Sequence, residues 1–330
     1  MKRYRLVLAR LLNSVVQRRD LAAIAERVEK QAPEIEVALA DKRRAGQWKL
    51  LPHAFRPTLT VAFGDLMRSR FLSGRILHCA TLLKHTELER LRAAGIPVPD
   101  WVVIEPDVRL DPAVWGPYVV VKPSAGGRGV DVRIRRTGRV RYQPPESFPP
   151  RHAIRKGPLM AQRFVYTGPW AVSYRVCTLF GRALYCWRVE QSHQKRRLES
   201  RWEFAGTADG GGIQIIAPSM TSTYTLVDDE EVIALAERAH RLAFPDYPYL
   251  GIDLLRDVES GEVSVIEANT GGNVWHLSSR LGISLQRAQG IDLYSQFGAL
   301  DRAAAQLVDA TRQHAMVAPI GRPQLPFRTR

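Results

Sequence analysis

Two carboxylates and one carboxamide in this sequence are spaced so that they could form a metal site. Asp253 lies in one extended apolar segment, and Glu267 and Asn269 lie in a second one. The Glu-Ser-Gly turn at 259–261 separates the two segments, and a Ser-Gly step between β-rich runs is typical of a hairpin. Because Ser260 is equidistant in sequence from Asp253 and Glu267, a hairpin centred there places these carboxylates opposite each other.

The strand period puts the three oxygen-bearing side chains on one face of this hairpin. Glu267 and Asn269 are two residues apart, whereas Ile266 and Ala268 point to the other face. Such a set suits Mg²⁺, which takes one or two protein carboxylates together with phosphate oxygens of a substrate. The alternative is a surface hairpin with solvated acids. Since the acids lie among Ile, Leu and Val, where an unpaired charge is costly, the metal site is favoured.

A glycine-rich loop, residues 124–129, follows an apolar strand that ends in Lys122. A Walker loop would join a strand to a helix and end in Gly-Lys-Ser/Thr. Here the lysine precedes the loop, and a strand predicted at 130–134 follows it. The loop is therefore predicted to be a hairpin tip, called the flap below, whose backbone N–H groups can approach phosphate oxygens. Lys122 and Arg128 would add positive charge, and a plain turn is the alternative.

Arginines and a long polar segment supply further candidates for anion binding. Arg175 and Arg188 lie in two predicted strands, where an arginine normally has an acidic or anionic partner. Either could instead be a surface residue, an explanation that is nearly as good for Arg188. Residues 191–212 are polar, basic and glycine-ended, and they include Arg201. This segment is either a lid that closes over a substrate or a solvated basic loop.

The elements that must position these residues follow from periodicity. Alternating strands and helices predict a small parallel α/β domain at the N-terminus. Apolar and amphipathic patterns then predict further strands and helices, joined by a polar, proline-rich and mobile connection at 139–156. The predicted strands are 5–12, 34–39, 58–63, 75–78, 101–105, 118–122, 130–134, 159–165, 174–179, 183–189, 251–255 and 263–269, and the predicted helices are 20–31, 84–94, 228–244 and 301–312.

Composition limits the class of protein and its partners. The chain has 330 residues and a net charge of +15, which favours anionic partners. Its three cysteines, Cys79, Cys177 and Cys186, are too scattered for a disulfide framework or a zinc cluster, and they indicate a reducing compartment. No apolar run approaches the roughly 20 residues that span a bilayer. The basic start could be a transit peptide, but a buried strand followed by a helix explains it better.

Taken together, these motifs resemble the ATP-grasp superfamily, specifically its amide-forming branch with D-alanine–D-alanine ligase, glutathione synthetase and peptide ligases. The resemblance is carried, in chain order, by KHTELERLRAAGIPVP, YVVVKPSAGGRGV, AQRFV, GIDLL and VIEANTGG. It covers about residues 84–272. It implies an α/β (α+β) ATP-grasp fold with an N-terminal Rossmann-like pre-ATP-grasp domain. The expected boundaries are 1–83 for that domain, 84–167 for a small lobe with the flap, 168–300 for a large lobe with the metal site, and 301–330 for a C-terminal helix and basic tail.

The resemblance implies roles for individual residues. Arg175 matches a phosphate-side arginine of the peptide ligases, and Glu267 could bridge two ions. The expected ATP contacts are Lys84, Lys122, Ser124, Gly126, Gly127, Arg128, Gly129, Gln162, Phe164, Val165 and Ile266, and the expected ligands of one or two Mg²⁺ ions are Asp253, Glu267 and Asn269.

Three departures from the family pattern bear on substrate recognition. Ser173 stands near the place where many relatives have an acidic ribose-binding residue. Gly251 replaces the arginine that precedes the first metal ligand in D-alanine–D-alanine ligase, so Arg188 or Arg201 is expected to supply the transition-state cation. The sequence after Asn269 also differs, which points to an unusual acceptor pocket.

The resemblance implies an ATP-dependent carboxylate–amine ligase that works through an acyl phosphate and releases ADP and phosphate. An ATP-grasp kinase acting on a hydroxyl of an anionic small molecule is the alternative. A basic nucleic-acid-binding protein is a third reading, disfavoured because the basic residues are spread over all regions. His193 and His276 could be general bases or structural residues. Expected partners are small-molecule or peptide carboxylates and amines, with no membrane, a homodimer left open, and a cytoplasmic location.

Overall fold

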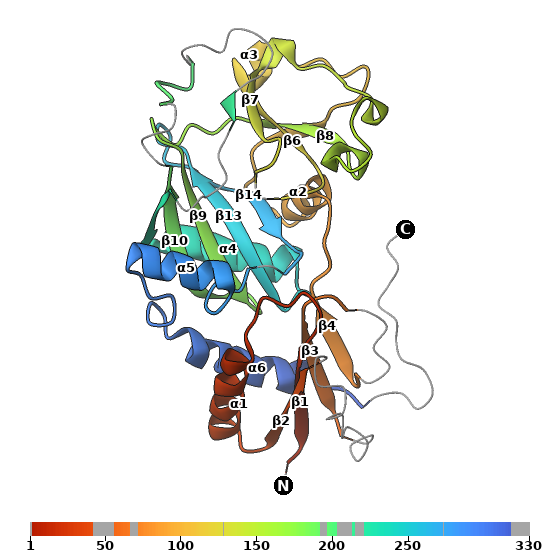
Figure 1. Ribbon diagram of the computed structural model, residues 1–330, viewed down its shortest axis with the longest axis vertical. Coiled ribbons are helices and arrows are strands. Elements are labelled where there is room, and N and C mark those ends of the chain that lie inside the picture. The colour runs from red at the N-terminus through yellow and green to blue at the C-terminus, as the bar shows by residue number, and fades with distance from the viewer. Residues whose placement is uncertain are drawn as a thin grey trace.

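The computed structural model describes residues 2–41, 56–66, 72–127, 129–191, 197–202, 213–214, 221–272 and 274–317. Within them, three sheets follow one another along the long axis of the molecule (Figure 1). The predicted α/β class is confirmed, since a parallel N-terminal sheet is followed by two antiparallel sheets with helices against them. None of the helices in the described part of the chain has the length and apolar character needed to cross a membrane.

The N-terminal sheet has four parallel strands in the order β2-β1-β3-β4. Leu6 and Leu8 on one face of β1 pack in a core with α1, and Val7 and Ala9 on the other face enter a smaller cluster. α6, near the C-terminal end of the described chain, packs against α1 on this domain (Figure 1). The elements are β1 (Tyr4–Arg10), α1 (Arg18–Gln31), β2 (Ile35–Asp41), β3 (Thr58–Phe63), β4 (Arg75–His78) and α6 (Ala299–His314).

The second sheet is antiparallel, with strand order β11-β7-β6-β8-β5. Its edge strand β11 comes from far along the chain. Three 3₁₀ helices lie between β7 and β8. The strands are β5 (Trp101–Val103), β6 (Tyr118–Pro123), β7 (Arg133–Arg136), β8 (Leu159–Arg163) and β11 (Ile213–Gln214), the helices beside them are α2 (Lys84–Ala93) and α3 (Pro112–Trp115), and the 3₁₀ helices are Thr137–Arg139, Pro145–Ser147 and Ala153–Arg155.

The third sheet is also antiparallel, in the order β12-β10-β9-β13-β14. α4 packs against β9, β10 and β13, with Val232, Leu235, Ala236 and Ala239 buried at helical spacing. On the opposite face, Cys177, Leu179 and Tyr185 enter the core shared with the N-terminal domain, α6 contacts β10, and another part of the face lines the cavity described below. The elements are β9 (Val172–Leu179), β10 (Arg182–Glu190), β12 (Thr223–Leu226), α4 (Glu230–Ala243), β13 (Tyr249–Arg256), β14 (Val263–Asn269) and α5 (Arg280–Gln289).

One local prediction is wrong. The strand expected at 130–134 begins only at Arg133, because Gly129 and Asp131 have φ angles of 66° and 61° and the chain is still turning there. The predicted connection at 139–156 is present between β7 and β8, where the 3₁₀ helices Pro145–Ser147 and Ala153–Arg155 form within it, and its mobility stays a prediction. The other predicted strands and helices are present, with ends that differ by a few residues.

A buried carboxylate connects the first helix to the C-terminal region. Asp20 is 2% exposed, and its two oxygens accept hydrogen bonds from Trp275 Nε1 at 2.7 Å and from the Tyr294 hydroxyl at 2.9 Å. Trp275 is itself fully buried in the core that joins the N-terminal domain to the third sheet. A buried donor that loses its acceptor keeps its full desolvation cost.

We therefore predict that Asp20→Ala lowers the free energy of unfolding by about 2–3 kcal/mol, because Trp275 and Tyr294 lose their acceptor. Urea denaturation followed by circular dichroism would measure this loss. Glu26→Ala is the matched control, because Glu26 is an exposed acid on the same helix, and it should change stability by less than about 0.5 kcal/mol. Equal effects of the two substitutions would contradict the structural role of Asp20.

Candidate active site

The predicted acid hairpin is present, and its register depends on a bulge. Asp253 pairs with Glu267 and Gly251 pairs with Asn269, which confirms the predicted opposition of the two carboxylates. From Leu254 onward, however, the pairing shifts by one, so Leu254 faces Val265 and Ile266 has no partner of its own. The pairing next to the turn is centred half a residue before Ser260. The extra residue, Ile266, shifts the pairing so that Asp253 and Glu267 face each other. Without this bulge, Asp253 and Glu267 would lie on opposite faces.

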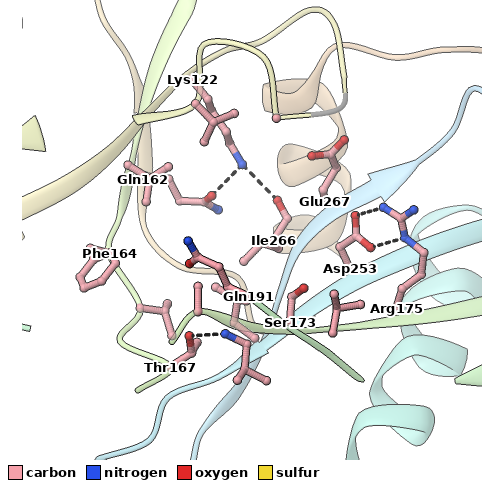
Figure 2. A pocket seen from close by; sticks show the side chains of 18 of the residues that line it. Lys122, Gln162, Phe164, Thr167, Ser173, Arg175, Gln191, Asp253, Ile266 and Glu267 are labelled. Atoms are coloured by element: carbon pink, nitrogen blue, oxygen red, sulfur yellow. Dashed lines mark hydrogen bonds and ion pairs between the residues drawn. The ribbon is translucent and has the colours of Figure 1, made fainter. Parts of the chain in front are cut away.

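The bulge also changes the position of Ile266. Simple alternation turns Ile266 away from the acids, yet in the structure it lines the same cavity as Glu267. Its carbonyl oxygen lies 3.4 Å from Lys122 Nζ (Figure 2). Bulges commonly redirect a side chain in this way near functional sites.

Arg175 holds Asp253 by a two-pronged ion pair. Its Nε and one terminal nitrogen donate to the two Asp253 oxygens at 2.6 and 2.7 Å (Figure 2). Burial lowers the pKa of Arg175, but attraction by Asp253 outweighs it and the pKa is raised overall. Asn269 Nδ2 adds bonds to Asp253 Oδ2 at 3.0 Å and to the Gly251 carbonyl at 3.1 Å. The amide nitrogen of Asn269 is thus engaged, and its oxygen is the atom suited to a metal.

Two lysines bring positive charge to the other side of the acids. Lys84 Nζ lies 3.3 Å from Glu267 Oε1 and donates to the Gly126 carbonyl at 2.6 Å. Lys122 is 4% exposed and donates to Gln162 Oε1 at 2.8 Å. Burial is the main cause of the lowered pKa of Lys122, and the charge of Glu267 opposes it. Each carboxylate at this end of the site therefore has a cation beside it, Arg175 beside Asp253 and Lys84 beside Glu267.

The flap is attached at its first residue to the start of α2. Ser124 is 1% exposed, its carbonyl accepts from the Lys84 backbone N–H at 2.9 Å, and its hydroxyl lies 2.6 Å from His85 Nδ1. Gly126 and Gly129 have φ angles of 89° and 66°, values that favour glycine. The predicted contact at Arg128 lies outside the described residues.

A cavity of about 230 Å³ lies between the second and third sheets. One part is apolar, with Val120, Ile134, Phe164, Val172 and Leu255 among its walls, and the other part holds the charged cluster (Figure 2). Strand alternation explains the lining, because residues two apart face it: 120 and 122 in β6, 173 and 175 in β9, 253 and 255 in β13.

The cavity gathers most, but not all, of the predicted site residues. Ser173, the residue near the expected ribose position, also lines it. The predicted residues that line the cavity are Lys122, Gly129, Gln162, Phe164, Val165, Arg175, Asp253, Ile266, Glu267 and Asn269. Lys84, Ser124, Gly126 and Gly127 do not line it, and of these Lys84 and Gly126 contact each other beside Glu267.

Arg188 and Arg201 are not where the sequence analysis expected a transition-state cation. Arg188 lies between Trp187 and Val189, which line the cavity, so its side chain leaves the opposite face of β10 and pairs with Glu190 at 2.6 Å. Arg201 binds both oxygens of Asp257 at 2.7 Å, at the turn end of the acid hairpin. Strand alternation and local acids thus hold both guanidinium groups outside the cavity lining.

Sequence reasoning missed several residues of the cavity. Trp187, Gln191, Thr167, Leu198 and Ser222 line it. Trp187 could have been found, because it alternates with Arg188 in a strand predicted correctly. Leu198 could not, since it belongs to the long polar segment and reaches the cavity through backbone contact with Pro169. Residues 192–196, including His193, and residues 203–212 lie outside the described residues, and the lid stays a prediction.

His276 is a poor candidate for a general base. It is 6% exposed, its ring stacks on Trp187 with centroids 5.1 Å apart, and its Nε2 is buried without a hydrogen-bond partner. Burial, reinforced by the charge of Arg175, lowers its pKa to about 3. A base works best with a pKa near the working pH, so the neutral, buried ring fits a structural role.

The donor set fits Mg²⁺. Two carboxylates and an amide oxygen from Asp253, Glu267 and Asn269 lie on one face of the hairpin and line the cavity. This number of protein oxygens is the one that Mg²⁺ takes when phosphates complete its coordination. Arg175 already occupies both oxygens of Asp253, so Glu267 is the more open of the two carboxylates.

Comparison with known proteins gives structural likenesses alone. No protein-family model and no curated protein matches this sequence. The ATP-grasp ligase PsnB, complexed with a minimal precursor, is 16% identical at a TM-score of 0.49 and covers 91% of this chain and 99% of its own. D-cycloserine synthetase DcsG is 16% identical at a TM-score of 0.48. The match covers 92% of this chain and 99% of the synthetase. D-alanine–D-alanine ligase from Bacillus anthracis, complexed with ATP, is 14% identical at a TM-score of 0.43. The match covers 93% of this chain and 98% of the ligase.

These names agree with the resemblance found in the motifs. At such identities and TM-scores, however, the likenesses support no statement about reaction or substrate. What the cavity can do is inferred below from its own side chains.

The Arg175–Asp253 pair generates a prediction about stability. The two side chains are 22% and 17% exposed, so removing one leaves a largely buried charge. Arg175→Gln should lower the free energy of unfolding by about 3 kcal/mol. In a double-mutant cycle with Asp253→Asn, the losses should be non-additive by about 2 kcal/mol, measured by urea unfolding.

Arg27→Gln is the control for that cycle. Arg27 pairs with Asp301 at 2.9 Å, but the two side chains are 35% and 67% exposed. Its loss should cost less than about 1 kcal/mol. Additive effects of Arg175→Gln and Asp253→Asn would contradict a direct pair.

Buried histidines generate a prediction about pH. Burial lowers the pKa of His240 to about 4 and that of His276 to about 3, against an ordinary value of 6.5. Between pH 6.5 and these values the unfolded chain binds protons that the native chain does not, so stability falls as the pH falls. His276→Gln should reduce this loss between pH 6 and pH 5 by about 1 kcal/mol, measured by urea unfolding at each pH. An unchanged slope would show that His276 titrates normally.

Proposed function

We propose that this chain is an ATP-dependent carboxylate–amine ligase of the ATP-grasp type. The observation that supports this most directly is one cavity with an apolar part and a charged end, where Lys122, Arg175, Asp253, Glu267 and Asn269 meet. A nucleotide has the same division into an apolar base and an anionic phosphate chain. Residues 84–167 and 168–300 would be the two lobes that hold it between them.

The apolar part suits an adenine ring. Phe164 and Val165 follow β8, and their side chains and those of Val120 and Leu255 line this region. Gln162 Nε2 is buried without a hydrogen-bond partner, while its Oε1 accepts from Lys122. An unpaired buried donor is costly, so Nε2 is suited to bind an acceptor of a ligand in the cavity.

The charged end suits the phosphate chain. Lys122 is held at the wall of the cavity by Gln162 and the Ile266 carbonyl, and Lys84 is placed beside Glu267 and the flap. Fixed cations in a partly buried site stabilise the charge that moves during phosphoryl transfer. When bound at Asp253, Glu267 and Asn269, Mg²⁺ would neutralise phosphate oxygens.

The reaction proposed needs no covalent bond to the protein. None of the described residues that line the cavity is a cysteine or a histidine, the usual activated nucleophile and base. A substrate carboxylate would attack the γ-phosphate of ATP, giving an acyl phosphate and ADP, and an amine would then displace phosphate. The protein's residues act by positioning and by charge stabilisation.

The experiment that tests the proposal is a phosphate-release screen with Mg-ATP and pools of amino acids and peptides, followed by mass spectrometry of the products. Phosphate release that requires both a carboxylate and an amine, with a product one water lighter than their sum, supports the ligase. A stable phosphorylated product without any amine requirement would replace it with the kinase alternative.

Substitution of the charged end should abolish turnover without unfolding the protein. Lys122→Ala, Glu267→Gln and Asn269→Ala should each lower kcat/KM by at least about 100-fold, because each removes a group that faces the phosphates or the metal. Lys156→Ala removes an exposed lysine outside the cavity lining and is the control for charge. Wild-type activity in any of the three site variants would remove that residue from the site.

The substrates and the location belong to the same proposal. Carboxylates and amines of small molecules or peptides are the expected partners. The three cysteines are free thiols, and Cys177 and Cys186 are buried. Free thiols and a need for ATP favour the cytoplasm.

A further inference from the structure

A second cavity, separate from the one described above, lies on the opposite face of the second sheet. Its volume is about 150 Å³. In β6, Val120 and Lys122 face the first cavity, and Val121 between them lines the second. In β7, Ile134 faces the first cavity, and Arg133 and Arg135 line the second (strands β6 and β7 in Figure 1). The β period thus separates two sites by the thickness of one sheet.

The second cavity is strongly basic at its walls. Three arginines line it, Arg133, Arg135 and Arg141, of which Arg141 also donates to the backbone carbonyls of Gly138 and Val140 at 2.8 and 2.7 Å. Asp131, the acid among the lining residues, lies 3.1 Å from His152 Nε2 and is therefore already paired on one side. Arginines thus outnumber acids among the residues that line the cavity, which favours an anion there.

Arg135 provides the most direct indication that the cavity binds an anion. Its Nε is buried and has no hydrogen-bond partner. Burial, followed by repulsion from Arg133, lowers the pKa of Arg135. An arginine that is desolvated beside another arginine is costly to keep unless an anion is bound there. A purely structural arginine would instead be expected to satisfy this nitrogen.

The rest of the cavity is apolar and aromatic. Val121, Val140, Ile154 and Leu159 form its apolar wall. Phe148 and His152 lie with ring centroids 4.8 Å apart at another side. Such a lining suits a ligand with a carbon body more than it suits a bare inorganic ion, which would leave the apolar wall without contact.

We propose that this cavity binds a small organic anion that carries carboxylate groups on a short carbon chain. The planar guanidinium groups of Arg133, Arg135 and Arg141 would each match the geometry of a carboxylate. The cavity volume of about 150 Å³ admits a molecule of metabolite size. The site is independent of the proposed ligase chemistry, because none of its residues lines the first cavity.

The cavity also borders the flap. Asp131 lies two residues after the flap, and the 3₁₀ helix Ala153–Arg155 contributes Ile154 to the cavity wall. Ala153 of the same helix lies so near the flap that a Cβ on Gly126 would meet its Cβ at 3.3 Å. An anion bound in the second cavity would therefore restrict the movement of the flap, because it would contact segments that adjoin the flap.

Isothermal titration of the full chain with citrate tests the proposal. Citrate should bind with one-to-one stoichiometry, and Arg135→Gln should weaken binding roughly tenfold or more, the effect of losing one charged hydrogen-bond donor. Arg136→Gln is the matched control: it removes the same charge one residue away on β7, from a side chain that does not line the cavity. It should change the affinity by less than about twofold.

Two further arms separate this site from the nucleotide cavity and from simple ions. Lys122→Ala should leave citrate binding unchanged, whereas loss of binding in Lys122→Ala would assign citrate to the first cavity and overturn the proposal. Inorganic phosphate should bind more weakly than citrate, and equal or tighter binding would overturn the carboxylate assignment. Absence of citrate binding, or equal weakening by Arg135→Gln and Arg136→Gln, would also overturn it. If Arg135→Gln does not fold, Arg141→Gln, at an exposed position, replaces it in the same comparison.

Discussion

Charge compensation is the constraint on which the candidate site depends. Asp253 and Glu267 lie on the interior face of a sheet, and each carboxylate has its own cation, Arg175 for the first and Lys84 for the second. Without these cations, two acids facing each other across a hairpin would repel and lose hydration at once. The cations come from β9 and from the start of α2, so both elements must be packed against the hairpin before the acids are stable where they are.

The hairpin itself is adjusted by one residue to make this possible. Ile266 forms a bulge that keeps Asp253 and Glu267 on one face, and its carbonyl oxygen then reaches toward Lys122. One backbone irregularity therefore sets both the side-chain pairing and a contact to the opposite sheet. The acid hairpin and the lysine strand are connected through it across the cavity.

One sheet has two uses in this protein. Alternate residues of β6 and β7 face two different cavities, one with Lys122 and the acids and one with a group of arginines. Part of the net charge of +15 is therefore concentrated at these two cavities, because basic residues line both faces of the same strands. The polar connection at 139–156 supplies part of the wall of the second cavity, including Phe148, His152 and Ile154.

Local chemistry in the sequence was sufficient for much of this fold. The period of two identified the strands, and the Ser-Gly turn identified the acid hairpin and its facing carboxylates, because these signals depend on residues near one another in the chain. The glycine flap and Lys122 were also recognisable, since a turn and a strand end carry their own composition.

Tertiary structure decided the rest. The bulge at Ile266, the turning of Arg188 and Arg201 away from the cavity, and the arrival of Leu198 at its wall all depend on register and on contacts between distant segments. The arginine-lined cavity likewise exists because residues 148–159 fold back on β6 and β7. A sequence pattern reports which residues share a face, but which segment that face meets is determined by packing of the whole chain.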